Sequence, residues 1–267
     1  MLKKRIIFTL LYDSGNFVLS RNFRLQKVGT IDWLRKNYNF SEVAFYIDEL
    51  IILDVSRENR NVDLFAETVR QISRNCFVPI AAGGGIRTLK DAHKLLRAGA
   101  DKIVINSIIF ENLNFVKALS TEYGRQCLVA SLDVYRENNK KIKLFTQNGS
   151  VEQLENIKYL ISQCLSSPVG EIYLNSMNQD GTAQGYDLEL LDLFPKELQQ
   201  PVILAGGAGH GEHLLKGLKD DRVDAVATAN LFNFIGDGLE KARKFIVSNG
   251  IPLATWPSIA DLRQNEK

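Results

Sequence analysis

Two glycine-rich stretches give the first indication of chemistry. One is PIAAGGGIR, from Pro79 to Arg87, and the other is PVILAGGAG, from Pro201 to Gly209. In each, a short apolar run stops at glycines, whose missing Cβ lets the backbone turn sharply and approach a ligand closely. Successive exposed N–H groups at such a turn form a concavity that suits an anion. The alternative interpretation is that these glycines only make tight turns.

Each glycine stretch is followed by an apolar segment that ends in short polar residues. The first of these segments is AGADKIVINS and the second is DRVDAVATAN. The repeated layout predicts two matched half-sites for phosphate, and therefore an elongated ligand with a phosphate at each end. The first half-site comprises Gly84, Gly85, Asn106 and Ser107; the second comprises Gly206, Gly207 and Asn230, joined by Asp180, Gly181 and Thr182.

An internal duplication supplies the elements that must position these residues. Pro79 and Pro201 lie 122 residues apart, and KRIIFTLLYD matches QCLVASLDVY at the same offset. The chain contains eight apolar, strand-like segments in two sets of four, alternating with helical patterns. This predicts a (βα)8 TIM barrel with a twofold internal repeat, and such barrels carry their chemistry at the carboxyl ends of the strands. We expect one barrel over residues 1–252, with half-repeats at about 1–124 and 125–252, and an unassigned extension over 253–267.

Several local patterns refine this picture. A polar loop from Asp13 to Gly29 follows the first strand and is long enough to form a lid over a site. Alternation over Lys141–Thr146 predicts a small hairpin over the barrel mouth. The amphipathic sequence VEQLENIKYLISQCL, residues 151–165, predicts a helix. Thr88 with Asp91 three places later predicts a capping-box helix start.

The composition argues against several classes of partner. With 45% hydrophobic residues, 24% charged residues and a net charge of +2, the chain has neither the basic excess of a nucleic-acid binder nor a membrane-length apolar run. Cys76, Cys127 and Cys164 are an odd number without metal-type spacing, so we expect reduced thiols in a cytoplasmic protein. His210 and His213 have no evident third ligand, and we expect neither metal nor cofactor.

The motifs KRII, DELIILD, GGGIRT, AGADKIVIN, NQDGT with GYDLEL, and AGGAG together resemble those of one family. It is the family of cyclase subunits of imidazole glycerol phosphate synthase, from histidine biosynthesis. The resemblance extends from Leu2 to about Pro252. It implies a lyase-type barrel that takes ammonia from a glutaminase docked at its bottom, N-terminal face, as a heterodimer. The ammonia is then used to split and cyclise a bisphosphorylated phosphoribulosyl-formimino-aminoimidazole carboxamide ribonucleotide into imidazole glycerol phosphate and an aminoimidazole carboxamide ribonucleotide.

In this family two facing carboxylates, from strands one and five, act as acid and base. Asp133 matches the strand-five aspartate, but Leu11 stands where the family has the strand-one aspartate. Asp13 lies two residues later and is either a substitute or a turn residue, since DSG is a strong turn signal. In the loop after strand one, Leu19 replaces a family lysine, and Arg21 is the nearest cation.

The opposite end of the barrel keeps the family pattern. Charged residues stand at or near the starts of strands one, two, four and six, namely Arg5, Glu49, Lys102 and Glu171. The resemblance implies a salt-bridged ring that gates the entry of ammonia from the glutaminase. The alternative is a set of strand-end ion pairs that only closes the core.

Two functions of different class therefore stay open. The first is an ammonia-dependent cyclase with Asp133 as its acid or base. The second is an ammonia-channelling partner of a glutaminase and a sugar amidotransferase, because relatives with an altered strand one resemble components of surface-polysaccharide (lipopolysaccharide) biosynthesis. A third, the sister sugar-phosphate isomerase, also needs the strand-one aspartate, and the charged ring argues against it.

Overall fold

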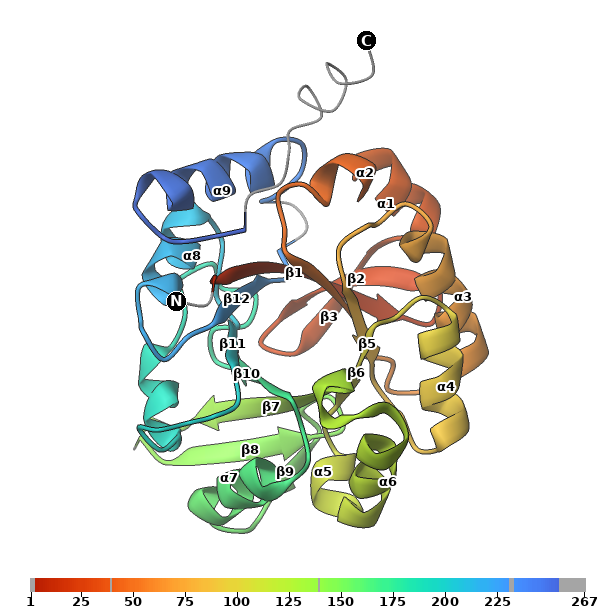
Figure 1. The fold of residues 1–267 in the computed structure, drawn as a ribbon, viewed down its shortest axis with the longest axis vertical. Coiled ribbons are helices and arrows are strands. Elements are labelled where there is room, and N and C mark those ends of the chain that lie inside the picture. Colours follow the sequence, from red (N-terminus) through yellow and green to blue (C-terminus); the bar gives the residue numbers. More distant parts are fainter. Residues whose placement is uncertain (1–2, 39, 139, 231–232, 255–267) are drawn as a thin grey trace.

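The computed structural model describes residues 3–38, 40–138, 140–230 and 233–254, and these form a closed parallel barrel surrounded by helices (Figure 1). Eight strands pair in the order β10-β11-β12-β1-β4-β5-β6-β7, and pairing of β10 with β7 closes the ring. The predicted TIM barrel is confirmed. Its strands are β1 (Arg5–Asp13), β4 (Glu49–Asp54), β5 (Ile80–Gly83), β6 (Lys102–Ile105), β7 (Leu128–Arg136), β10 (Glu171–Ser176), β11 (Val202–Ala205) and β12 (Ala225–Thr228).

The barrel strands are apolar on both faces because each face is buried. In β1, Ile6 and Phe8 point outward into the layer shared with the helices, whereas Ile7 points inward. The inner layer packs branched side chains such as Ile51 and Ile203 against alanines of β5, β11 and β12. Because side chains alternate along a strand, every second residue of a barrel strand points into the barrel interior. Such a residue lies near one end of the barrel or in its middle.

The helices lie around the outside of the barrel (Figure 1). The capping box predicted for Thr88 and Asp91 is present at the start of α4. The helices are α1 (Ile31–Asn37), α2 (Phe40–Val43), α3 (Val62–Ser73), α4 (Leu89–Arg97), α5 (Ile108–Glu111), α6 (Leu113–Tyr123), α7 (Ile157–Ser166), α8 (Gly211–Leu218) and α9 (Gly238–Ser248), with 3-10 turns η1 (Arg125–Cys127) and η2 (Leu188–Leu193).

The segment after strand one is a hairpin rather than the predicted polar loop. Strands β2 (Asn16–Arg21) and β3 (Arg24–Gly29) pair antiparallel, and β2 also pairs with the end of β1. The backbone turns at Asn22 and Phe23, both with positive φ. The loop prediction was wrong because Phe17 and Val18 pair with Tyr12 and Leu11 of β1 and are buried, a contact that the local polarity of the segment does not reveal.

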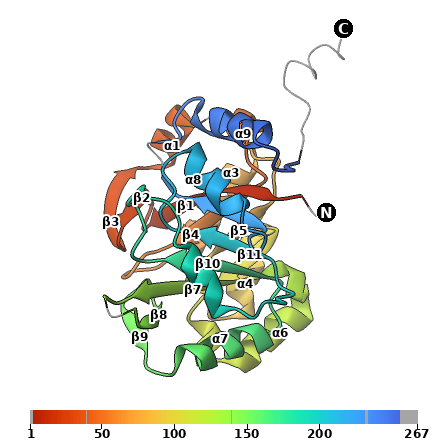
Figure 2. The same ribbon diagram turned by 90° about the vertical axis from the view of Figure 1, so that its left-hand side faces the viewer.

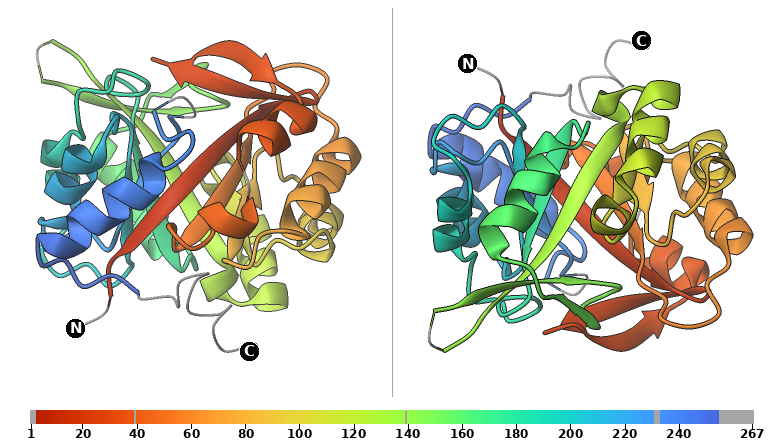
Figure 3. Two further views of the ribbon diagram at one scale, coloured as in Figure 1. Left: turned by 90° about the horizontal axis from the view of Figure 1, so that it is seen from above. Right: turned by 90° about the horizontal axis from the view of Figure 1, so that it is seen from below.

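A second hairpin lies over the same end of the barrel. Strand β8 (Ile142–Thr146) pairs with both β7 and β9 (Val151–Gln153), which confirms the hairpin predicted here. The helix predicted over 151–165 is wrong in its first part, because α7 starts only after its N-cap, Asn156. Both hairpins lie at the carboxyl ends of the barrel strands, opposite the N-terminus (Figures 2 and 3).

The first and the last described segments meet at the other side of the barrel. Lys4 forms a parallel bridge with Leu253, so the end of the last βα unit is tied to the start of the first strand. Most of the expected C-terminal extension, residues 255–267, lies outside the described residues. Among the described helices, none combines the length and the apolar character that crossing a membrane requires.

Candidate functional site

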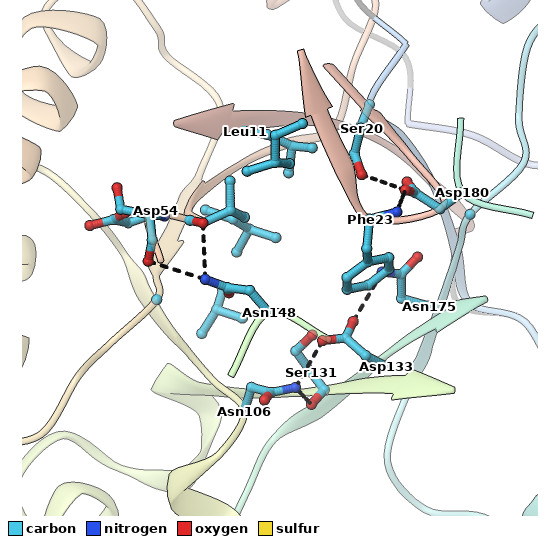
Figure 4. Close-up of a pocket in the computed structure, with 18 of the residues that line it drawn as sticks. Leu11, Ser20, Phe23, Asp54, Asn106, Ser131, Asp133, Asn148, Asn175 and Asp180 are labelled. Atoms are coloured by element: carbon cyan, nitrogen blue, oxygen red, sulfur yellow. Dashed lines mark hydrogen bonds between the residues drawn. The ribbon is translucent and has the colours of Figure 1, made fainter. Parts of the chain in front are cut away.

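A cavity of about 660 Å³ opens at the carboxyl ends of the barrel strands, beneath the two hairpins (Figure 4). Nearly all the residues predicted to bind the ligand line it. They come from the ends of β5, β6, β7, β11 and β12 and from the loop after β10: Gly84, Gly85, Asn106, Ser107, Asp133, Asp180, Gly181, Gly206, Gly207 and Asn230. The fold thus brings segments far apart in the sequence to one concave surface.

The first glycine stretch needs glycine for steric reasons. Gly84 has φ +108°, and a Cβ there would lie 2.1 Å from the carbonyl oxygen of Asp54. At Gly85, a Cβ would meet the side chain of Arg60, which also lines the cavity. Arg60 donates to the carbonyl oxygen of Ser56 at 2.7 Å and pairs with the buried Asp54 carboxylate at 3.5 Å. A guanidinium therefore stands beside the predicted first phosphate half-site.

The second glycine stretch is equally confined. Gly207 has φ +107°, and a Cβ there would lie 2.0 Å from the carbonyl oxygen of Gly185. Gly206 and Gly207 line the cavity with Asn230. Thr182 was also predicted here, but it does not line the cavity, because its hydroxyl donates to the carbonyl oxygen of Gln179 at 2.8 Å and stabilises its own turn.

Asp133 lies on the floor of the cavity, between the two half-sites (Figure 4). It is 8% exposed, and its oxygens accept hydrogen bonds from Nδ2 of Asn106 at 3.2 Å and from Nδ2 of Asn175 at 3.0 Å. Burial raises the pKa of Asp133 to about 7; the Asn175 hydrogen bond opposes the shift and the charge of Asp180 adds to it. A carboxyl group with this pKa can both donate and accept a proton near neutral pH.

Across the cavity from Asp133, β1 presents Leu11 (Figure 4). Asp13 is not one of the cavity-lining residues. It pairs with Asn16 at the β1–β2 turn, which favours the turn interpretation over the substitute role. The cavity therefore faces one carboxylate on β7 and a leucine at the matching position of β1.

The β2–β3 hairpin is fastened over the cavity. Oδ2 of Asp180 accepts hydrogen bonds from Oγ of Ser20 and from the backbone N–H of Phe23. Burial raises the pKa of Asp180, and the hydrogen bond from Ser20 opposes this. Gly181 lies so close to the hairpin that a Cβ there would be 2.0 Å from the Ser20 carbonyl oxygen. The hairpin also brings Leu19, Arg21 and Phe23 into the cavity wall.

The other hairpin and the loop after β4 complete the rim. Nη2 of Arg57 donates to the Phe23 carbonyl oxygen at 2.8 Å, and Nδ2 of Asn148 donates to that of Val55 at 2.9 Å. The backbone N–H of Gln147 donates to Oγ of Ser107 at 3.0 Å. These contacts connect three separate loops above the cavity, so the site is covered in this structure.

At the opposite end of the barrel the four predicted charged residues form a ring. Nη1 of Arg5 lies 2.9 Å from Glu49 and 3.1 Å from Glu171, and Nζ of Lys102 lies 3.0 Å from Glu49 and 3.1 Å from Glu171. Each cation thus bridges both carboxylates. Burial raises the pKa of Glu49, and Lys102 opposes this most strongly. The ring closes the amino-terminal end of the barrel interior.

No cluster that could hold a metal ion is found among the described residues. The rings of His210 and His213 stack at 3.7 Å, and Nδ1 of His213 accepts the backbone N–H of Gly209 at 3.2 Å. Burial lowers the pKa of His213. Both histidines thus have structural contacts at the start of α8, and neither lines the cavity.

Two residues that shape the site are not predicted from the sequence. Arg60 reaches the cavity only through tertiary contacts, and Phe23 enters through the hairpin turn that was expected to be part of a polar loop. No local signal identifies either of them. Asn175, by contrast, is a polar residue at a strand end on the same face as Glu171, which is the pattern that predicts a site residue, and it lines the cavity.

Comparisons with known proteins agree with this geometry. A family model described as "Histidine biosynthesis protein" matches residues 34–236. A protein of Parasynechococcus marenigrum (strain WH8102), named provisionally as imidazole glycerol phosphate synthase subunit hisF2, is 47% identical over 261 residues, which are 97% of each chain. Imidazole glycerol phosphate synthase subunit HisF of Dictyoglomus thermophilum is 35% identical over 252 residues, 94% of this chain and 98% of that protein. The chain therefore belongs to the histidine biosynthesis protein family and is similar along nearly its whole length to HisF subunits of imidazole glycerol phosphate synthase.

Proposed function

We propose that this chain is the ammonia-accepting subunit of a glutamine amidotransferase of the imidazole glycerol phosphate synthase type. A glutaminase docks at the amino-terminal face of the barrel, and ammonia passes the charged ring to a bisphosphorylated ligand in the cavity. The observation that carries the proposal is the position of Asp133, a buried carboxyl group with a pKa of about 7, in a cavity that both glycine stretches line. We assign the two glycine stretches to the two phosphates of the ligand.

The ring supports the entry route. It lies at the end of the barrel interior opposite the cavity, and its two cations and two carboxylates neutralise one another. Glu49 is buried and the other three side chains are partly buried. Replacing such a set of paired charges by apolar residues often stabilises a protein. A gate therefore explains the four charged side chains at this end of the barrel better than core stability alone does.

The chemistry assigned to the cavity is proton transfer. Asp133 donates or accepts the proton as ammonia condenses with the ketone carbon of the phosphoribulosyl unit, with loss of water, and then displaces the aminoimidazole carboxamide ribonucleotide from the formimino carbon, which closes the imidazole ring. Leu11 cannot supply the second carboxylate that the family resemblance implies, so the remaining proton transfer passes through water. The proposed subunit therefore binds its ligand normally but turns it over slowly.

A second candidate function rests on the same residue. With Leu11 opposite Asp133, the barrel would accept ammonia from the glutaminase and pass it to another acceptor, such as a sugar amidotransferase. In this case the cavity binds a phosphorylated ligand as a signal that activates the glutaminase rather than as a substrate.

The test is turnover of the bisphosphorylated ribonucleotide by the purified chain in excess ammonium at high pH, beside an Asp133→Asn variant. Slow turnover that disappears in the variant supports the cyclase. Absence of turnover, in a protein that still binds the ribonucleotide and stimulates a glutaminase, refutes the cyclase and supports ammonia delivery. Failure to bind the ribonucleotide at all refutes both.

A further inference from the structure

Strand β10 presents polar side chains at three successive inward positions. Glu171 belongs to the charged ring, Tyr173 follows, and Asn175 holds Asp133. Inward residues of a strand are about 7 Å apart, because each residue advances it by about 3.3 Å. The strand therefore marks a path from the ring to the cavity floor, with a tyrosine hydroxyl halfway.

The surroundings of Tyr173 are otherwise aliphatic. It is 5% exposed and packs in the inner layer with Ile7, Val104, Val129 and others. This layer also contains four alanines, Ala81, Ala205, Ala225 and Ala227, which come from β5, β11 and β12. The small residues leave the space that the aromatic ring occupies.

The Tyr173 hydroxyl has an unusual partner for such a layer. It lies 3.4 Å from Oγ1 of Thr9, which is 1% exposed. This distance is longer than the roughly 2.5–3.0 Å of ordinary hydroxyl pairs. Tyr173 also lines the lower part of the cavity, so its side chain is reached from above. Two buried hydroxyls that bond each other only weakly retain the capacity to bind a small polar molecule.

We propose that Tyr173 and Thr9 form a binding station for neutral ammonia, midway between the charged ring and Asp133. This inference rests on the proposed function and deepens it. The tyrosine O–H donates to the nitrogen lone pair, and an ammonia N–H donates to Oγ1 of Thr9. Tyr173 and Thr9 are positioning residues that hold the molecule in line with the Asn175–Asp133 pair.

The station selects ammonia over ammonium. Burial of a cation among aliphatic side chains is strongly unfavourable without a paired anion, and the layer around Tyr173 is built from aliphatic side chains. The carboxylates of the ring lie one layer below and are already bridged by Arg5 and Lys102. Neutral ammonia can therefore enter this layer, whereas ammonium is excluded from it.

Ammonia binding can be measured on the full-length chain alone by NMR of protein labelled with ¹³C at the tyrosine ring carbon that bears the hydroxyl. Tyr173→Phe identifies the Tyr173 resonance, and Tyr135→Phe, at an exposed strand position, is the matched control. Ammonium chloride at high pH is expected to shift the Tyr173 resonance saturably, whereas potassium chloride is not. Thr9→Val is expected to weaken the effect about tenfold, as loss of one hydrogen bond predicts. An unmoved Tyr173 resonance, or a shift also caused by potassium, overturns the station.

The role in transfer is tested in the complex with a glutaminase. Tyr173→Phe is expected to lower product formation fed by glutamine about tenfold more than product formation fed by ammonium salt, since added ammonia also reaches Asp133 directly from the cavity side. An unchanged or increased glutamine-fed rate refutes the role of the hydroxyl while the proposed function stands. If the unmodified chain neither activates the glutaminase nor forms product from glutamine, the proposed function falls, and the NMR titration alone decides whether ammonia binds.

Discussion

The replacement Leu11→Asp tests the proposal that this barrel turns its ligand over slowly because it lacks a second carboxylate opposite Asp133. Leu11 lies across the cavity from Asp133 and is 8% exposed (Figure 4). A carboxylate placed there faces the cavity, not the helix layer, because the alternating outward positions of β1 are Leu10 and Tyr12. The change therefore creates a pair of facing carboxylates without altering any phosphate-binding residue.

The magnitudes follow from burial and from the charge of Asp133. Loss of the buried leucine side chain is expected to destabilise the fold by about 2–3 kcal/mol. Two nearby carboxylates raise each other's affinity for a proton, so the pKa of Asp133 is expected to rise further above 7. One member of the pair then stays protonated near neutral pH. A positioned general acid or base contributes about 10²- to 10⁴-fold, and we expect turnover to rise at least about a hundredfold.

The assay is ammonium-fed turnover of the bisphosphorylated ribonucleotide as a function of pH. Leu11→Asp should give a bell-shaped profile, whereas the unmodified chain should show one ionisation. The matched control is Leu53→Asp, because Leu53 pairs with Leu11 on the neighbouring strand and also lines the cavity. A folded Leu11→Asp protein that binds the ribonucleotide but gains no more activity than the control refutes the reasoning.

Three further perturbations test other parts of the account. The pKa of Asp133 is raised in the fold, so its contribution to stability is most favourable below pH 4 and is lost as the pH rises through 7, on the order of 4 kcal/mol in all. Between pH 5 and pH 8 about 2–3 kcal/mol of this should be lost in the unmodified chain and not in Asp133→Asn, which chemical denaturation of both proteins at the two pH values measures. Gly207→Ala should lower the free energy of unfolding by about 3 kcal/mol or more, because the new Cβ would collide with a carbonyl oxygen. In the control Gly236→Ala, where φ is positive but no neighbour lies within 4 Å, the loss should be only about 1 kcal/mol. Equal losses in thermal unfolding would contradict the steric argument. Lys102→Met should leave Glu49 with one cationic partner, Arg5. Glutamine hydrolysis should then be uncoupled from product formation, while ammonium-fed turnover persists. Coupling that is retained in a folded variant would refute the role of the ring as a gate.

The barrel and most of its site could be predicted because the duplication repeats their signals. Each glycine stretch ends a buried strand, and carboxyl ends of parallel strands meet at one face, so Gly85 and Gly207 had to share that face. The charged ring was implied by the family resemblance. Alternation agrees with it, since Lys102 and Glu171 occupy the inward side of strands that carry Asn106 and Asn175 at the other end.

What sequence reasoning could not provide depends on tertiary contacts. Arg60 sits beside Gly85 because its loop folds back over the end of β4, a geometry that local polarity does not encode. The β2–β3 hairpin is held over the cavity by Asp180, far along the chain, which accepts hydrogen bonds from Ser20 and Phe23. The raised pKa of Asp133 likewise needs burial, which becomes known only once the hairpins cover the cavity.

The central claim is that ammonia reaches the cavity through the barrel. The most direct measurement supplies the complex with glutamine carrying ¹⁵N in its side-chain amide, together with unlabelled ammonium in the medium and the bisphosphorylated ribonucleotide. We expect the nitrogen incorporated into the product to be predominantly ¹⁵N. When Lys102→Met disrupts the ring, we expect the incorporated nitrogen to shift toward the unlabelled isotope. Product that carries the isotope ratio of the medium in the unmodified complex would contradict passage through the barrel.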